Sequence, residues 1–193
     1  MTGASFQTQV RESITVLEAL LEQTYTVEQM IEVVCNALQA GHSLFTCGNG
    51  GSAADALHLS QELVGRYRSN RVPLASVCLN ADVTAMTCIA NDFGYDQVFA
   101  RPLQALARSG DILVCFSTSG QSPNMLAALE MARTQGVISI ALLGKDGGAA
   151  LSLANYALVV PSNSTARIQE VHTLILHAMC EAVEQVFPAD TTG

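Results

Sequence analysis

Apolar residues recur along this chain with two different spacings. Over residues 4–23 and 26–40 they recur every three or four positions, which is the spacing of a helix with one buried face, and the second pattern stops at Gly41. Beyond Gly41, short continuous apolar runs alternate with longer helix-like segments. We expect strands at 43–47, 74–79, 112–116, 138–143 and 156–160, and a long final helix over 165–186.

Strands without polar alternation are typical of a parallel sheet that helices cover on both faces. Connections between such strands are right-handed, so the pattern predicts a three-layer α/β fold with a doubly wound, five-stranded parallel sheet. No repeat or linker interrupts the chain, and we therefore expect a single domain over residues 1–193. Residues 1–40 form a helical extension with more apolar residues than isolated helices would bury, which predicts a contribution to an oligomer interface.

The composition limits the possible partners and location. The 193 residues are 49% hydrophobic and 13% charged, which is enough apolar material for a large core. The formal net charge of -8, with Lys145 as the only lysine, argues against binding to nucleic acid. No apolar stretch approaches about 18 residues and the N-terminal segment has no signal core, so we predict neither a membrane span nor secretion. The six cysteines show no Cys-x-x-Cys spacing, which favours a reduced, cytoplasmic protein.

Two short polar segments, 47–52 and 117–122, each follow a predicted strand and precede a helix-like run. Backbone N–H groups at a helix start are unpaired, and the helix dipole favours negative charge there. The glycines of the first segment allow close approach of a ligand, and the serines of both segments add hydroxyl donors. This pair of segments at one sheet edge predicts a site for a phosphorylated ligand.

His58 and Glu62 follow the first polar segment, four residues apart on one face of the predicted helix. An imidazole and a carboxylate at this spacing can hold a divalent transition metal, and Glu62 can alternatively take a proton from a substrate. A hydrogen-bonded pair with no further role is the competing interpretation.

The final helix carries Gln169, Glu170, His172 and His177 among apolar residues. Gln169 and His177 are eight residues apart, roughly 12 Å along a helix at ~1.5 Å per residue, so spacing alone favours Gln169 with His172 as partners. Each histidine could instead be a hydrogen-bonded core or interface residue.

Two further polar groups have open interpretations. Arg66, Arg68 and Arg71 could draw a phosphate towards the site, or they could be a solvated helix end. Asn91 and Asp92 precede a helix break, where they could form a turn or bind sugar hydroxyls.

Five motifs occur in order along the chain, namely CGNGGSAADALH at 47–58, ELVGRY at 62–67, NDFG at 91–94, STSGQS at 117–122 and RIQEVH at 167–172. Together they closely resemble the sedoheptulose 7-phosphate isomerases, also called phosphoheptose isomerases, of the sugar isomerase (SIS) domain superfamily. The resemblance spans nearly the whole chain and implies the flavodoxin-like form of the doubly wound fold.

The resemblance also implies site residues. It implies one zinc ion per subunit with ligands at His58, Glu62, Gln169 and His177, and it makes Glu62 and His177 the acid/base pair. This set takes the place of the pairing with His172. The substrate contacts that it implies are Asn49, Gly50, Gly51, Glu62, Asn91, Asp92, Ser117, Thr118, Ser119, Ser122 and Gln169, with Ser52 and Arg66 as neighbours.

The implied reaction converts D-sedoheptulose 7-phosphate into D-glycero-D-manno-heptose 7-phosphate, on the way to the heptose of bacterial surface polysaccharides. Glu62 would remove a proton from C1, an enediol or enediolate would form, and His177 would donate a proton. The family suggests a homotetramer with active sites near the subunit contacts.

Three alternatives stay open. A related SIS adaptor binds the bacterial replication initiator, but it lacks the acid/base pair at the positions that match Glu62 and His177. A similar isomerase could act on another sugar phosphate. Finally, Gly48, Gly50 and Ala53 satisfy a loose dinucleotide fingerprint, although the expected acidic residue about 20 positions on is missing and Asn80 lies near that strand end.

Overall fold

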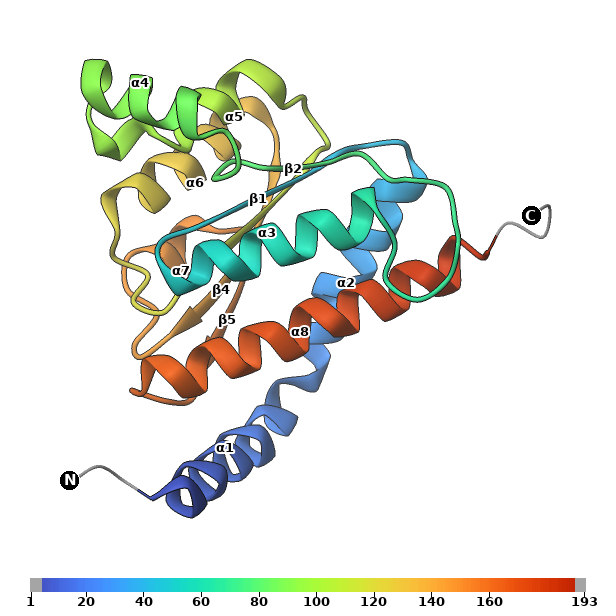
Figure 1. The fold of residues 1–193 in the computed structure, drawn as a ribbon, viewed down its shortest axis with the longest axis vertical. Helices are drawn as coiled ribbons and strands as arrows, with labels where there is room; N and C mark the ends of the chain where they lie inside the picture. Colours follow the sequence, from blue (N-terminus) through green and yellow to red (C-terminus); the bar gives the residue numbers. More distant parts are fainter. Residues whose placement is uncertain (1–4, 190–193) are drawn as a thin grey trace.

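The computed structural model describes residues 5–189, which alternate between helices and strands (Figure 1). The helices are α1 (Phe6–Leu20), α2 (Thr24–Gln39), α3 (Gly51–Val64), α4 (Val83–Phe93), α5 (Ala100–Leu106), α6 (Pro123–Gln135), α7 (Ala150–Leu153) and α8 (Thr165–Val186), with short 3-10 helices η1 (Leu21–Gln23) and η2 (Tyr95–Gln97). The strands are β1 (Leu44–Gly48), β2 (Ser76–Cys78), β3 (Ile112–Ser117), β4 (Ile138–Gly144) and β5 (Tyr156–Val160).

All five strands are parallel, in the order β2-β1-β3-β4-β5. The chain leaves β1 towards one edge of the sheet and β3 towards the other, so the direction of winding reverses between these two neighbours. Ligands of such sheets bind beyond the carboxyl ends of the strands at this reversal. The predicted doubly wound, flavodoxin-like sheet is confirmed, and both polar segments follow the two strands that flank the reversal.

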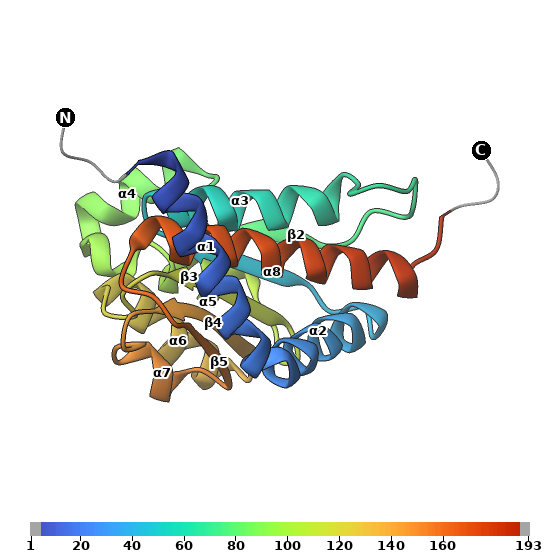
Figure 2. The same cartoon turned by 90° about the horizontal axis from the view of Figure 1, so that it is seen from below.

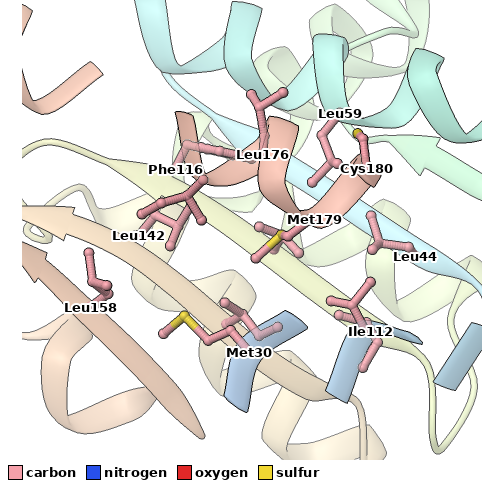
Figure 3. Packing of buried hydrophobic residues seen from close by; sticks show 14 of the residues in the cluster. Met30, Leu44, Leu59, Ile112, Phe116, Leu142, Leu158, Leu176, Met179 and Cys180 are labelled. Carbon is pink, nitrogen blue, oxygen red and sulfur yellow. The ribbon is translucent and has the colours of Figure 1, made fainter. Parts of the chain in front are cut away.

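Helices cover both faces of the sheet, as the unbroken apolar strands predict. Alternate residues of β3 pack into the cores on the two faces of the sheet, because successive side chains of a strand point to opposite faces. Ile112 and Phe116 join the core under α2, α3 and α8, while Leu113 and Cys115 join the core under α4 to α7. Figure 3 shows the first of these cores, where Met30 of α2, Leu59 of α3 and Met179 of α8 converge on the sheet.

The two predicted N-terminal helices are present as α1 and α2, joined through η1. The hydroxyl of Ser5 accepts a hydrogen bond from the Thr8 N–H at 3.2 Å and so caps α1, while the predicted start at residue 4 lies outside the described residues. α1 extends away from the sheet along the start of α8 (Figures 1 and 2).

One strand is shorter than predicted. The apolar run 74–79 forms β2 only over Ser76–Cys78. The Leu74 N–H donates to the Leu63 carbonyl at the end of α3, so this part of the run pairs with a helix end. Among residues 5–189, no helix is both long and apolar enough to cross a membrane.

Candidate active site

The first polar segment makes a tight turn from β1 into α3. Gly50 precedes the helix with a φ of 57°, a conformation that side chains disfavour. Gly51 begins the helix, and a Cβ on it would lie 2.4 Å from Nε2 of Gln169 on α8. Glycine at these two positions therefore allows both the turn and the close approach of α8.

The second polar segment makes the corresponding turn from β3 into α6. Within it, the Ser117 hydroxyl accepts a hydrogen bond from the Gly120 N–H at 3.0 Å. Ser122 is the N-cap residue of α6, but its side chain makes no capping bond. The hydroxyl of Ser122 is therefore not needed to hold the start of this helix.

The two turns and the start of α8 enclose one hollow at the carboxyl ends of β1 and β3. It is lined by Asn49, Gly51, Ser52, Phe116, Ser117, Thr118, Ser119, Ser122, Thr165 and Gln169. Most of the substrate contacts predicted from the sequence thus meet at one place, together with backbone N–H groups at the starts of two helices.

Residues that the sequence analysis did not single out brace the first turn. Asn49 and Asn124 exchange two amide hydrogen bonds of 2.9 Å, and the Tyr95 hydroxyl donates to Asn49 Oδ1 at 3.1 Å. Asn124 is almost fully buried at the start of α6. Its place one residue after Pro123, at a helix start, was the only sequence signal available.

Asn80 also braces this turn. Its side-chain amide donates to the Gly48 carbonyl at 2.7 Å, and its Oδ1 accepts from the Gly48 N–H at 3.1 Å. The residue at the end of the second strand therefore holds the loop backbone, a different task from that of the ribose-binding carboxylate in the dinucleotide interpretation.

Asn91 and Asp92 lie in the last turn of α4, which ends at Phe93 as the predicted helix break requires. Both are exposed, and the Asn91 amide donates to Asp92 Oδ1 at 2.7 Å. They are not among the residues that line the hollow. Their contact with substrate stays a prediction.

α3 and α8 run side by side in the same direction, and a second polar group lies further along them (Figures 1 and 2). His58 Nε2 is 3.2 Å from Glu62 Oε1, and the His58 ring meets the His177 ring edge-on with centroids 5.0 Å apart. The structure therefore brings His58, Glu62 and His177 together.

These three side chains provide donor atoms that suit zinc. Two ligand atoms bound tetrahedrally at about 2.1 Å from zinc lie about 3.4 Å apart, close to the 3.2 Å between His58 Nε2 and Glu62 Oε1. As they stand, no three His, Cys, Asp or Glu side chains in the described part of the chain converge tightly enough to hold an ion. Gln169 instead contacts the first turn of α3, near Gly51.

His172 lies in the core, as one of the two interpretations of this residue predicts. It is fully buried, its Nε2 is 3.3 Å from the Leu143 carbonyl, and its ring meets that of Phe116. Burial lowers the pKa of His172 to about 4, so it is a neutral imidazole. The pairing of Gln169 with His172 that spacing favoured is therefore wrong.

The arginine cluster is largely a helix end. Arg71 is buried and its guanidinium donates to the carbonyls of Glu62, Leu63 and Val72. Arg68 is exposed and pairs with Glu181 at 2.7 Å. Arg71 caps α3, which contradicts a role for it in attracting phosphate, and Arg66 is exposed beyond that helix.

Comparison with known proteins places this arrangement in a family. A family model described as the SIS domain matches residues 5–144. The chain is 46% identical over 178 residues to the phosphoheptose isomerase of Geobacter sp. (strain M21), covering 92% of this chain and 93% of that protein.

Two solved structures have the same fold. The phosphoheptose isomerase from Neisseria gonorrhoeae superposes with a TM-score of 0.86 at 38% identity, covering 94% of this chain and 100% of that one. The phosphoheptose isomerase from Francisella tularensis gives 0.89 at 33% identity, covering 93% and 96%. This chain belongs to the SIS domain family and, within it, to the phosphoheptose isomerases.

Proposed function

We propose that this isomerase interconverts D-sedoheptulose 7-phosphate and D-glycero-D-manno-heptose 7-phosphate through an enediol or enediolate. The names of its relatives support the substrate class. One observation carries the proposal. The hollow between the two turns lies at the starts of α3 and α8, and His58, Glu62 and His177 meet further along the same two helices.

In this proposal the two turns at the starts of α3 and α6 anchor the phosphate end of the substrate. Backbone N–H groups at the starts of α3 and α6, with the hydroxyls of Ser119 and Ser122, bind the phosphoryl group. Anchoring the far end holds C1 and C2 beside the catalytic side chains and lowers the entropic cost of reaching the transition state.

Glu62 and His177 carry the proton transfers. The Glu62 carboxylate removes the proton from C1 and returns it to C2, and His177 moves a proton at the adjacent oxygen. The Glu62 side chain is only 13% exposed, so a bound sugar would exclude most of the remaining water from it.

We also propose zinc as the cofactor, held by His58, Glu62 and His177 with Gln169 as the fourth ligand. The spacing of His58 Nε2 and Glu62 Oε1 supports the first pair of ligands. When bound, zinc would polarise the sugar oxygens and spread the developing negative charge.

We further propose that the protein is a homotetramer in the cytoplasm and that it supplies heptose for surface polysaccharide. An open apolar groove between α1, α2 and α8 supports assembly, because Ile14, Leu21 and Leu174 are 49%, 70% and 48% exposed along it. Light scattering should give a mass near four times 20.4 kDa.

The decisive assay incubates the protein with sedoheptulose 7-phosphate in D2O and follows the aldose by NMR. We expect aldose in which C2 carries deuterium only in those turnovers where the proton on Glu62 exchanges with solvent before it is returned, together with loss of turnover with a chelator and recovery with zinc. Absence of aldose from zinc-loaded protein would disprove the substrate assignment. Parallel assays with other seven- and eight-carbon ketose phosphates test the alternative substrates.

The adaptor alternative predicts no turnover with any sugar phosphate. The convergence of His58, Glu62 and His177 supports the enzyme instead, since an adaptor has no use for an acid/base pair held between two helices.

A further inference from the structure

Tyr67 packs its ring against the imidazole of His177. The centroids of the two rings are 5.7 Å apart and their planes are inclined by 31°, a separation within the range of favourable aromatic pairs. His58 meets the same imidazole edge-on, with the centroids 5.0 Å apart. The His177 ring therefore contacts a histidine of α3 and a tyrosine of the segment that follows α3.

Ring contacts of this kind hold the imidazole of His177 in place. Within residues 5–189, no hydrogen bond or ion pair joins this ring to another group. The torsion about the Cβ–Cγ bond of a histidine has broad minima, so a ring without hydrogen bonds can turn unless its neighbours block it. Proton transfer and metal binding both need a ring nitrogen that points in one direction. The neighbouring rings therefore set the direction of the His177 nitrogens.

Tyr67 reaches His177 because Glu184 of α8 holds the segment that follows α3. His177 and Glu184 are seven residues apart, about two helical turns, and so share one face of α8. Glu184 Oε1 accepts hydrogen bonds from the backbone N–H groups of Arg68 at 2.7 Å and Ser69 at 2.8 Å. Figure 1 shows this segment running past the later part of α8.

The ring of Tyr67, rather than its hydroxyl, makes the contact with His177. The hydroxyl donates to Glu181 Oε1 at 3.3 Å in an exposed place, where water can take over the bond. The ring packs against the edge of the core under α2, α3 and α8. Its position is therefore fixed by packing and by the backbone bonds of the next two residues.

We propose that Tyr67 is the positioning residue of His177. Its ring keeps the imidazole turned towards His58 and Glu62, and Glu184 keeps the segment that carries this ring against α8. The proposal rests on the proposed function, in which His177 is a catalytic group and a zinc ligand.

The first test compares the kinetics of Tyr67→Leu, which removes the aromatic ring, with those of Tyr67→Phe, which keeps it. We expect kcat to fall about tenfold in Tyr67→Leu, at the lower end of the effect of removing a residue that supports a metal ligand. KM should change less than about twofold, because the loop hollow is intact, and Tyr67→Phe should keep kcat within about threefold of the wild type. Equal losses in both variants, or wild-type kcat in Tyr67→Leu, would overturn the proposal.

The second test asks whether Glu184 acts through Tyr67. Glu184→Ala removes the acceptor of the two backbone N–H groups and should also lower kcat. If Glu184 acts by holding Tyr67, the double variant falls no further than Tyr67→Leu alone. Losses that add would show that Glu184 acts by another route and would contradict this part of the proposal.

The third test does not depend on turnover. In protein labelled with 13C at histidine Cε1, the four histidines should give separate signals, and His177 is assigned with His177→Gln. We expect a nuclear Overhauser effect between the rings of Tyr67 and His177 in the wild type. The His177 signal should move or broaden in Tyr67→Leu but not in Tyr67→Phe, while the signal of buried His172 stays in place and reports an intact fold. A wild type without the effect between the rings refutes the proposal even if Tyr67→Leu does not fold.

The proposed function and this inference can fail separately. No turnover with any sugar phosphate, together with a His177 signal that responds to Tyr67→Leu, removes the reaction and leaves the positioning role. Wild-type turnover with unchanged kcat in Tyr67→Leu keeps the reaction and removes that role.

Discussion

The rings of His58 and His177 lie 5.0 Å apart at 81°, although the two residues are on helices at opposite ends of the sheet-forming part of the sequence. The contact exists because α3 and α8 pack side by side on one face of the sheet and run in the same direction (Figure 1). It brings two imidazoles and the Glu62 carboxylate together.

Glu62→Gln should abolish turnover and leave the fold intact. The only hydrogen bond described for its carboxylate joins it to His58, so the amide keeps the shape but removes the base. General base catalysis typically contributes about 10²–10⁴-fold, and we expect kcat to fall by that order. Steady-state kinetics and thermal unfolding provide the measurement.

Glu181→Gln is the matched control for this variant. Glu181 of α8 pairs with exposed Arg68 and accepts a hydrogen bond of 3.3 Å from the Tyr67 hydroxyl. Neither contact involves a proposed catalytic group directly, so Glu181→Gln should leave kcat unchanged. Normal activity in Glu62→Gln would contradict the assignment of the base.

The sheet could be predicted from the sequence because its signals are local. Strands buried on both faces read as unbroken apolar runs, and the predicted run 156–160 coincides with β5. β2 was predicted too long because the Leu74 N–H pairs with the end of α3, a contact between segments that no local pattern records.

The loops of the site could be predicted from the sequence, but the side-chain hydrogen bonds that connect distant segments could not. Glycine and serine at strand ends indicate an anion site directly. The Asn49–Asn124 amide pair and the Asp55–Thr173 bond join residues 75 and 118 positions apart, and only the folded sheet brings them together. The assignment of Gln169 came from resemblance, and its position beside Gly51 could not be derived from helical spacing.

Gly51→Ala should weaken substrate binding without unfolding the protein. The new Cβ would lie 2.4 Å from Nε2 of Gln169, a flexible side-chain end that can move away. Loss of one hydrogen bond of about 1 kcal/mol to substrate raises KM about fivefold. Steady-state kinetics of the wild type and of Gly51→Ala give the two KM values.

Gly48→Ala is the contrasting variant. A Cβ at position 48 would clash with the backbone carbonyl of Ser52, and this carbonyl cannot move without shifting α3. We expect poor folding or a large drop in melting temperature. Equal stability of the two glycine variants would contradict this account of the turn.

Arg71→Met should destabilise the protein through the end of α3. The buried guanidinium donates to three carbonyls, and hydrogen bonds from a charged group contribute about 1.5–3 kcal/mol. We expect a loss of that order in urea unfolding, whereas Arg68→Met removes an exposed ion pair and should have a much smaller effect. Equal losses in the two variants would contradict the capping role.

His172 should make stability depend on pH. Burial lowers its pKa to about 4 in the folded protein, against about 6.5 when unfolded. The unfolded state therefore binds more protons between these values, so stability is complete above about pH 6.5 and falls as the pH drops towards 4. The pKa shift sets an upper bound of about 3 kcal/mol on the stability lost.

Urea unfolding at pH 7, 6 and 5 should show this loss of stability in the wild type. The loss should be smaller in His172→Gln, whose amide can still donate to the Leu143 carbonyl. Parallel pH profiles for both proteins would show that His172 is not the group responsible.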